Sequence, residues 1–354
     1  MNTIESNNYT IYFDNSLKSL SEFIAKNNYS KIFILTDELT CQYCLPVLQE
    51  KLPDLTEFDL IEVPNGEENK TIDFCIGIWR MLLDFEADRN ALLINLGGGV
   101  VTDMGGFAAS TFKRGIDFIN IPTTLLSQVD ASVGGKTGID MDNVKNVIGT
   151  FTQPKAVIIA SDFLNTLSER QLTSGFAEVI KHGIIADADF FDEISKLESA
   201  KDISEAQILK SISIKNKVVT EDPFEKGIRK TLNFGHTIGH AIESWSLNHD
   251  KNPLLHGEAI AIGMICEAYL AKEIVSLPNE DLDLIASTFL RYFDHYEIKA
   301  GIENQLLEIM KQDKKNVSGK INFSLPNKIG SCEIDHYLDE SLIKESLAFY
   351  INIQ

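Results

Sequence analysis

The chain has 354 residues, 44% hydrophobic and 24% charged, which is ordinary for a soluble globular protein and ample for a sizeable core. Its formal net charge is −20 and its pI is about 4.7. This balance argues against nucleic acid and anionic membrane surfaces as partners, because binding to them depends on basic patches. A small anionic ligand is not excluded, since a local group of Lys and Arg can hold a phosphate whatever the total charge.

The N-terminus and the cysteines indicate a cytoplasmic protein. The first residues, MNTIESNNYT, have neither the basic start nor the apolar core of a signal peptide. No apolar run approaches the roughly 20 residues that span a bilayer. Five cysteines, an odd number, argue against a disulfide framework. Cys41 and Cys44 form a lone C-x-x-C without a second pair, and we interpret them as two helix residues.

The first third of the chain alternates strand-like and helix-like segments. Short apolar runs that end in turn or polar residues predict strands over 31–37, 58–64 and 91–99. Amphipathic stretches near 38–51 and 70–84 predict helices between them. Strands that alternate with helices of this length indicate βαβ units and a parallel sheet.

The rest of the chain changes from mixed to helical patterns. DFINIPTT (117–124) predicts a further strand, and the glycine-rich segment 133–143 predicts a loop or hairpin. After about Ser161, long helical patterns follow one another to about Met310, and a short β-like pair and a last helix complete the chain. The resulting prediction is an α/β N-terminal domain with a Rossmann-like parallel sheet (1–160) and a mainly α-helical C-terminal domain (161–354).

The segment NLGGGVVTDMGG (95–106) follows a buried-looking strand and opens a helix. Glycines there let backbone N–H groups and the helix N-terminus approach a pyrophosphate. The pattern is not the usual dinucleotide fingerprint, because Thr102 stands where the third glycine would be. Two neighbours favour a nucleotide: Asp37 ends a strand where a ribose hydroxyl could be held, and PNGEENK (64–70) ends another with charged side chains. Each alone is also compatible with a tight turn or solvated charges.

The stretch TLNFGHTIGH places two histidines four residues apart in a segment that we predict to be helical. Four polar residues recur there at spacings of four, three and four: Arg229, Asn233, His236 and His240. A helix would present all four on one face, which suits the wall of a polar cavity better than a core. The H-E-x-x-H metal motif has a glutamate where Thr237 stands, so the spacing leaves open whether this pair binds one metal ion.

Two further segments offer metal ligands. SGFAEVIKHG contains Glu178 amid apolar helix residues with Lys181 one turn on, and LLHGEAIAIGM contains His256 just before an apolar helix. A catalytic zinc usually takes three protein ligands and leaves a position open. Glu178, His236 and His256 would form such a site, although spacing alone cannot locate ligands that are distant in sequence.

Cationic side chains are dispersed along the chain. Each lysine taken alone is better explained as a solvated surface residue, but the position of these side chains among glycine, asparagine and apolar residues raises the case for a functional role. They are Arg114, Lys136, Lys145, Lys181, Lys215, Arg229, Lys314 and Lys315.

Six motifs together resemble those of the 3-dehydroquinate synthase family. They are GGGVVTDMGGF, FKRGIDFINIPTTLLSQVDASVGGKTGID, SGFAEVIKHG, LNFGHTIGHAIES, LLHGEAIAIGM and DKKN. They cover most of 65–316 in the family's order, and several are too long for a chance match. The resemblance implies a phosphate-eliminating lyase of the shikimate pathway that uses one NAD and one Zn²⁺ or Co²⁺. Its substrate would be the anionic sugar phosphate 3-deoxy-D-arabino-heptulosonate 7-phosphate, its products 3-dehydroquinate and phosphate, and its assembly a homodimer.

The resemblance also assigns roles to residues. Glu178, His236 and His256 match the family's metal ligands, and His240 matches a polar group on the substrate side. His182 stands where the family more often has Tyr or Thr, and we interpret it as structural. Around the substrate phosphate the matching residues are Arg114, Lys136, Asn146 and Lys215. Around its carboxylate and hydroxyls they are Asp130, Lys181, Arg229, Asn233, His240 and Lys314, with Lys315 left open as the alternative to Lys314. The residues that match NAD contacts are Asp37, Asn65, Gly66, Glu67, Lys70, Gly98, Gly99, Val100, Val101, Thr102, Asp103, Thr123, Thr124, Lys136, Lys145, Phe163, Leu164, Asn165 and Thr166.

The implied chemistry accounts for this set of groups. A secondary hydroxyl loses hydride to NAD while the metal chelates two vicinal oxygens and polarises the new ketone. The ketone acidifies the adjacent C–H, so phosphate leaves by elimination, and a substrate phosphate oxygen can take the proton. Hydride then returns, the ring opens, and an intramolecular aldol reaction closes the carbocycle.

Three other functions stay open from the sequence. The nearest is another sugar-phosphate cyclase whose substrate lacks a carboxylate, but Arg229, Asn233 and His240 match the dehydroquinate pattern. A metal-dependent polyol dehydrogenase of the glycerol dehydrogenase type shares a GGG-x-x-x-D turn, and Glu178 and Lys136 argue against it. A non-catalytic binding homologue would be expected to lose some of these polar residues, and none is lost.

Overall fold

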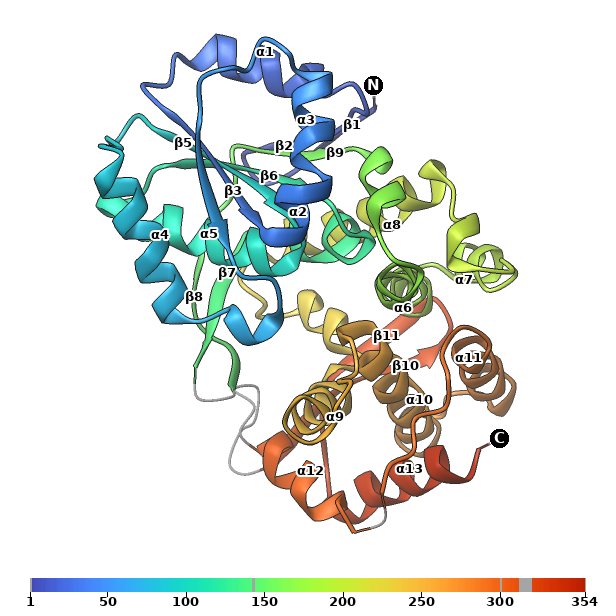
Figure 1. Cartoon of the computed structure of the whole chain (residues 1–354). Coiled ribbons are helices and arrows are strands. Elements are labelled where there is room, and N and C mark those ends of the chain that lie inside the picture. Colours follow the sequence, from blue (N-terminus) through green and yellow to red (C-terminus); the bar gives the residue numbers. More distant parts are fainter. Residues whose placement is uncertain (1, 142–143, 300, 312–319, 354) are drawn as a thin grey trace. The chain divides into compact units, whose positions relative to one another are not determined.

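Figure 1 shows the computed structural model of the chain, which describes residues 2–141, 144–299, 301–311 and 320–353. The chain divides into two compact units, an N-terminal unit over Met1–Ser168 and a C-terminal unit over Glu169–Gln354. No helix among the described residues is long and apolar enough to cross a membrane.

The described part of the N-terminal unit contains a seven-stranded sheet with the order β1-β2-β9-β6-β5-β3-β4. All neighbouring strands are parallel except β1 and β2. A separate antiparallel hairpin, β7–β8, confirms the hairpin alternative for the glycine-rich segment. The strands are β1 (Asn2–Glu5), β2 (Thr10–Phe13), β3 (Ile32–Asp37), β4 (Asp59–Val63), β5 (Leu92–Gly97), β6 (Asp117–Pro122), β7 (Lys136–Met141), β8 (Val144–Phe151) and β9 (Ala156–Ile159). The helices are α1 (Lys18–Asn27), α2 (Glu38–Tyr43), α3 (Leu45–Lys51), α4 (Ile72–Asp84) and α5 (Gly99–Thr111), with short η1 (Glu67–Asn69), η2 (Phe112–Arg114), η3 (Ser127–Ala131) and η4 (Ser161–Thr166).

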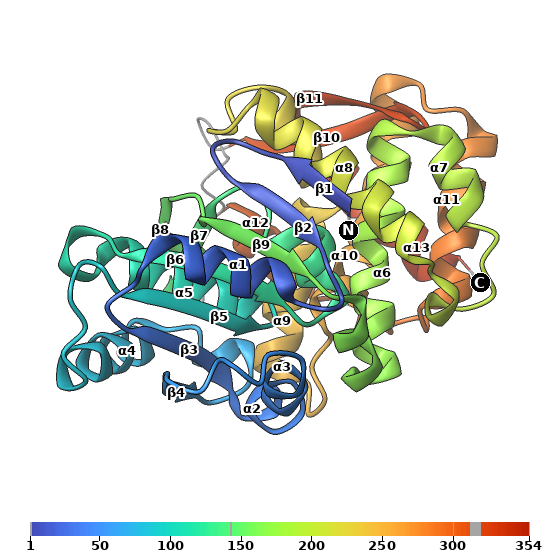
Figure 2. The same ribbon diagram turned by 90° about the horizontal axis from the view of Figure 1, so that it is seen from above.

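The parallel strands are apolar on both faces, and this pattern builds two cores. Phe33 and Leu35 of β3 belong to the core on the face that α4 and α5 cover, whereas Ile34 between them belongs to the opposite core. That opposite core includes Leu20 of α1 and Leu48 of α3. Strand side chains alternate between faces, so a sheet covered on both sides needs near-continuous apolar runs. The covering helices can be followed in Figure 1 and, turned by 90°, in Figure 2.

The strand order creates one position where the chain reverses its direction of progress across the sheet. From β3 the chain moves outward to β4, and then crosses back to β5 on the other side of β3. Ligands of doubly wound sheets bind at such a switch point, outside the carboxyl ends of the strands. Asp37 ends β3 and Gly97 ends β5, with α5 opening at Gly99. The prediction that the glycine motif follows a strand and opens a helix is confirmed.

One predicted helix of this unit is divided into two. The stretch 38–51 forms α2 and α3, which join at Cys44. Pro46 lies in the first turn of α3, where its missing N–H leaves no bond unmade. Cys41 lies in α2, and both thiols are free.

The C-terminal unit is mainly helical, as predicted, with a hairpin near its end. Helix α10 contacts α6, α9, α11, α13 and β10, and its nearly continuous apolar sequence is accordingly buried. The helices are α6 (Glu169–Ala186), α7 (Ala188–Ile194), α8 (Glu205–Glu221), α9 (His236–His249), α10 (His256–Val275), α11 (Asn279–Tyr292), α12 (Glu303–Lys311) and α13 (Glu340–Asn352). The remaining elements are η5 (Ala200–Asp202), η6 (Ile228–Asn233), β10 (Ile321–Lys328) and β11 (Ser331–Leu338).

The prediction that one helix carries Arg229, Asn233, His236 and His240 is wrong. Residues 228–233 form the short 3₁₀ helix η6, and α9 begins only at His236. Gly235 breaks the path with a φ of +80°, a left-handed conformation that favours glycine. Arg229 and Asn233 therefore do not share a helix face with the two histidines, which do lie one turn apart on α9.

Helices α9 and α10 pack closely because glycines line their contact. A Cβ on Gly263 of α10 would lie 2.0 Å from the Gly235 carbonyl oxygen. A Cβ on Gly239 would lie 3.0 Å from the Ile260 Cα, and one on Gly235 would lie 2.1 Å from the Met264 Cγ. This close approach fixes the distance between the two helices that carry all three candidate-site histidines.

We predict that Gly263→Ala destabilises the protein by about 1–3 kcal/mol, because the new methyl group meets backbone that cannot move aside. Urea unfolding measures the change. Gly77→Ala in α4 is the matched control, since a Cβ added there would have no atom of the described residues within 4 Å beyond its own helix backbone and chain neighbours. Alanine should raise helix stability there by about 0.5–1 kcal/mol. Equal stability of the two variants would contradict the close packing of α9 on α10.

Candidate metal and nucleotide sites

Three histidines of the C-terminal unit form a cluster. His236 and His240 come from α9, and His256 is the first residue of α10. One nitrogen from each imidazole lies within 4.8 Å of the other two. The ring centroids are 5.1 Å apart for His236 and His240, and 5.6 Å apart for His236 and His256. The nitrogens are thus close enough together for a single cation.

Glu178 of α6 adds a carboxylate to this cluster. Its Oε1 lies 3.5 Å from His236 Nε2 and 3.7 Å from His256 Nε2, and its side chain is fully buried. The C-terminal unit therefore brings together the three ligands that the family resemblance assigns. It places His240 beside them as a further imidazole.

The outer nitrogens of two histidines are held by acceptors. His236 Nδ1–H donates to the Phe234 carbonyl oxygen at 3.0 Å, and His256 Nδ1–H donates to Glu243 Oε2 at 3.3 Å. The Nε2 atom of each ring is directed toward Glu178, and a bound metal ion would meet these two nitrogens because the Nδ1 protons are held elsewhere. Metal-binding histidines typically show this arrangement, in which a carbonyl or carboxylate fixes the tautomer and the ring orientation.

The electrostatics of the cluster favour positive charge. Burial alone would lower the pKa of His256, but Glu243 and Glu178 outweigh it and raise the pKa to about 9. Lys181, one turn along α6, forms an ion pair with Glu178 Oε2, and its Nζ also donates to the Leu232 carbonyl oxygen at 2.9 Å. A divalent cation would supply the positive charge that these buried carboxylates favour.

The other predicted residues of the C-terminal unit lie on neighbouring segments. Arg229 is buried in η6, and its Nη1 donates to the Pro223 carbonyl oxygen at 2.7 Å. Asn233 Nδ2 donates to Glu225 Oε1 at 2.9 Å. Lys215 is buried on α8. Lys314 and Lys315 lie outside the described residues.

His182, which we interpret as structural from the sequence, lies in the interior of the C-terminal unit. Its side chain is fully buried on α6, with Nδ1 2.8 Å from the Ser211 hydroxyl oxygen of α8. The hydrogen bond joins two helices of the same unit.

The glycine turn of the N-terminal unit exposes backbone at the start of α5. Gly98 is the N-cap residue, the first turn carries Val100, Val101 and Thr102, and Asp103 follows in the next turn. Thr123, just after β6, donates its N–H to the Gly97 carbonyl oxygen at 3.0 Å and so ties the ends of β5 and β6 together. A Cβ on Gly98 would lie 3.2 Å from the Thr124 side chain. The turn is thus narrow, and small residues keep the helix N-terminus accessible to a ligand.

A buried lysine joins three segments beside this turn. Lys70 Nζ lies 2.7 Å from Asp103 Oδ2 of α5 and 2.6 Å from Asn146 Oδ1 of β8. Glu67 Oε1 lies 3.4 Å from Lys145 Nζ. Burial alone would lower the pKa of Lys70, but nearby carboxylates, Asp103 first, raise it instead. The network gathers predicted NAD residues with Asn146, which the resemblance had placed at the substrate phosphate.

The remaining predicted residues of this unit are less closely grouped. Asp37 Oδ1 accepts the Thr40 N–H at 2.7 Å and caps α2. Phe163 is buried in the core, whereas its neighbours Leu164, Asn165 and Thr166 complete η4. Asn65 and Gly66 lead into η1, Lys136 starts β7, Asp130 lies in η3, and Arg114 is exposed at the end of η2.

Glu243 is a site residue that the sequence analysis missed. It follows His236 by seven residues and His240 by three, so all three lie on one face of α9. That spacing was the available signal, but only the structure shows that the partner of Glu243 is His256.

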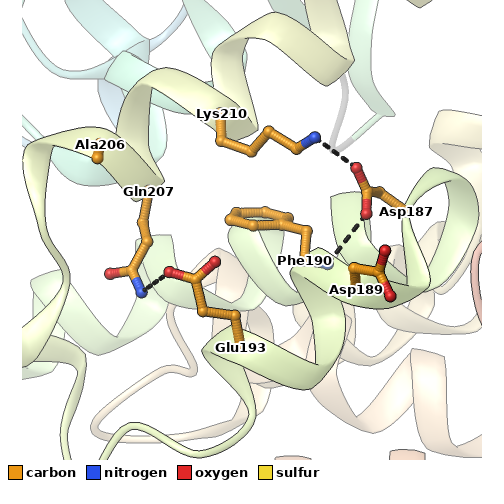
Figure 3. Close-up of a pocket in the computed structure, with 7 residues that line it drawn as sticks. All are labelled: Asp187, Asp189, Phe190, Glu193, Ala206, Gln207 and Lys210. Carbon is orange, nitrogen blue, oxygen red and sulfur yellow. Dashed lines mark hydrogen bonds and ion pairs between the residues drawn. The ribbon is translucent and has the colours of Figure 1, made fainter.

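A hollow between α7 and α8 lies apart from these sites (Figure 3). Its volume is about 400 Å³, and none of its lining residues was predicted as a site residue. Lys210 Nζ lies 2.6 Å from Asp187 Oδ2, and Gln207 Nε2 donates to Glu193 Oε1 at 2.7 Å. These polar groups are engaged with one another, and the hollow contains none of the predicted site residues.

Comparison with known proteins identifies the family. The models of the N-terminal and C-terminal parts of 3-dehydroquinate synthase match residues 60–174 and 175–316. The chain belongs to the 3-dehydroquinate synthase family. A 3-dehydroquinate synthase from Parabacteroides distasonis is 42% identical over 338 residues, which cover 94% of this chain and 95% of that protein.

Solved structures show the same fold. A 2-deoxy-scyllo-inosose synthase in complex with carbaglucose-6-phosphate, NAD⁺ and Co²⁺ has a TM-score of 0.86 at 24% identity, covering 98% of this chain and 99% of that one. A 2-epi-5-epi-valiolone synthase from Streptomyces hygroscopicus subsp. jinggangensis, with NAD⁺ and Zn²⁺ bound, has a TM-score of 0.83 at 23% identity and covers 99% of this chain and 98% of that one. The fold-class prediction is confirmed.

We predict that Glu243→Gln weakens binding of Co²⁺ by about 10- to 100-fold, because it removes the carboxylate that orients His256 and favours positive charge. Isothermal titration of the chelator-treated protein measures the affinity. Glu193→Gln, which makes the same change at the hollow between α7 and α8, should bind Co²⁺ as the wild type does. Unchanged affinity in folded Glu243→Gln would show that the hydrogen bond to His256 does not support a metal site.

Proposed function

We propose that the chain converts 3-deoxy-D-arabino-heptulosonate 7-phosphate into 3-dehydroquinate and phosphate, with bound NAD and one divalent metal ion. The observation that carries the proposal is the cluster of His236, His256 and Glu178, with both outer ring nitrogens held by acceptors. Family membership and the relative at 42% identity support the same reaction.

The metal-binding part of the proposal rests on the C-terminal unit. Glu178, His236 and His256 would hold Zn²⁺ or Co²⁺, the ions named for the two solved cyclases. The ion would polarise vicinal oxygens of the substrate and acidify the hydroxyl to be oxidised. Lys181, which forms an ion pair with Glu178, would add a cation next to the substrate oxygens.

The NAD-binding part rests on the N-terminal unit. The N-terminus of α5 and the glycines before it would bind the pyrophosphate, and Asp37 at the end of β3 would hold a ribose hydroxyl. Lys70, Asp103 and Asn146 would form a wall of this site. The hydrogen bonds of Lys70 Nζ to the other two side chains hold all three in place. Both solved cyclases contain NAD⁺, which supports the transfer of this role.

The substrate's charges define the remaining roles. Arg114, Lys136 and Lys215 would neutralise the phosphate, while Arg229 and Asn233 would bind the carboxylate and hydroxyls. His240, whose ring lies beside those of His236 and His256, would donate to a substrate oxygen. In a chain with a net charge of −20, these local cations must supply the attraction for an anionic substrate.

The reaction then needs no separate general base from the protein. Oxidation of the hydroxyl to a ketone acidifies the neighbouring C–H, and the departing phosphate can accept that proton. Re-reduction, ring opening and an intramolecular aldol reaction complete the conversion without net redox. The protein's residues contribute chiefly orientation and charge complementarity. The homodimer implied by the resemblance stays a prediction.

A second sugar-phosphate cyclase activity is the alternative. The two solved cyclases act in that class, but they are only 23–24% identical to the chain, whereas the relative at 42% identity is a 3-dehydroquinate synthase. Arg229 and Asn233 of η6 match the residues that the resemblance assigns to the substrate carboxylate, which further favours a substrate that carries one.

We predict that His256→Ala loses bound metal and phosphate-releasing activity together, by a factor of about 100 or more in rate. Metal content by elemental analysis and phosphate release from the heptulosonate substrate are measured on the same samples. His249→Ala is the matched control, because His249 lies near the end of α9 and its Nδ1 donates to the Trp245 carbonyl oxygen at 2.7 Å. Full activity in metal-free His256→Ala would refute the metal assignment.

A further inference from the structure

Glu267 is a fully buried acid in the middle of the apolar helix α10. Its carboxylate accepts two backbone N–H groups of the segment that starts α9. Gly235 N–H donates to Oε2 at 2.6 Å, and Ile238 N–H donates to Oε1 at 3.0 Å. A buried carboxylate is costly unless such donors compensate it, so this position is a specific interaction rather than core filling.

Helix α9 needs this partner because it cannot cap itself. The first N–H groups of any helix lack partners within the helix, and Ser, Thr, Asp or Asn at the N-cap usually supplies one. The N-cap residue of α9 is Gly235, which has no side chain to accept a hydrogen bond from the first N–H groups of the helix. A larger residue is excluded by the φ of +80° and by the Met264 Cγ, which would lie 2.1 Å from its Cβ. The cap is therefore provided by Glu267 from the neighbouring helix.

The two capped groups lie on either side of a candidate metal ligand. His236 follows Gly235 directly and precedes Ile238 by two residues. Its Nδ1–H donates to the Phe234 carbonyl oxygen at 3.0 Å, so the ring orientation depends on the backbone of the same turn. Any shift of this turn would move the His236 Nε2, which lies 3.5 Å from Glu178.

We infer that Glu267 is a positioning residue for metal binding, which holds the turn at Gly235 so that His236 presents Nε2 to the cation. The inference rests on the proposed metal site. The negative charge of Glu267 also lies at the positive end of α9, next to the candidate ligand His236, and favours a bound cation. Glu267 therefore links the two helices that carry the histidine ligands, in addition to their glycine contact.

The test is Co²⁺ binding by Glu267→Gln, followed by calorimetry and by the visible d–d absorption of the bound ion. The amide keeps the side-chain shape but turns one acceptor into a donor that faces a backbone N–H. We expect the dissociation constant for Co²⁺ to rise about 10-fold or more, with an altered absorption band. A folded variant with the wild-type affinity and band would overturn the inference.

Asp14→Asn is the matched control, because Asp14 accepts the Ser16 and Ser19 N–H groups at 3.0 and 2.8 Å around the start of α1 in the N-terminal unit. It removes a helix-end charge of the same kind and should leave Co²⁺ affinity unchanged.

If Glu267→Gln fails to fold, Glu267→Asp tests the inference by the same two measurements. Aspartate keeps the negative charge, but its side chain is one methylene shorter, so the carboxylate moves away from the backbone N–H groups of α9. Unchanged affinity in this variant would also overturn the inference. Absence of Co²⁺ binding in the wild type would instead refute the proposed metal site.

Discussion

The close approach of α9 and α10 is the constraint on which the candidate metal site depends. Gly235 and Gly239 on one side and Gly263 on the other allow backbone to meet backbone. Both helices begin with a candidate ligand, so the packing that brings them together also sets the spacing of His236 and His256. A methyl group at this contact would lower the stability of the protein and would also change the distance between His236 and His256.

Around this contact, buried acids are balanced by groups that can carry positive charge. Glu178 faces two histidines and forms an ion pair with Lys181, and Glu243 holds His256 from outside. Buried carboxylates without such partners would cost several kcal/mol each. The balance is compatible with a cation at the centre, because a divalent ion adds the charge that these carboxylates favour.

The sequence predicts most elements of the N-terminal unit because their patterns are local. Apolar runs over β3, β4 and β5 and the glycine turn before α5 have clear periods and boundaries. The helix expected from Arg229 to His240 is interrupted at Gly235, which has a φ of +80°. The atoms that leave no room for a side chain at Gly235 belong to α10, which is remote in sequence, so local periodicity could not reveal the break. Glu267 could not be found from the sequence, since its partners are backbone groups of α9. The residue types suggested Glu178, His236 and His256 as metal ligands, but spacing alone cannot show that residues distant in sequence meet, and the family resemblance supplied the assignment.

An internal redox cycle that releases phosphate separates the proposed reaction from that of a dehydrogenase, and one assay measures both signals. Purified protein with Co²⁺, a trace of NAD and the heptulosonate 7-phosphate is followed for phosphate and for nicotinamide absorbance together. We expect the protein to release phosphate in an amount equal to the substrate consumed, with no accumulation of NADH. Accumulation of NADH without phosphate would contradict it and would indicate a dehydrogenase on the same fold.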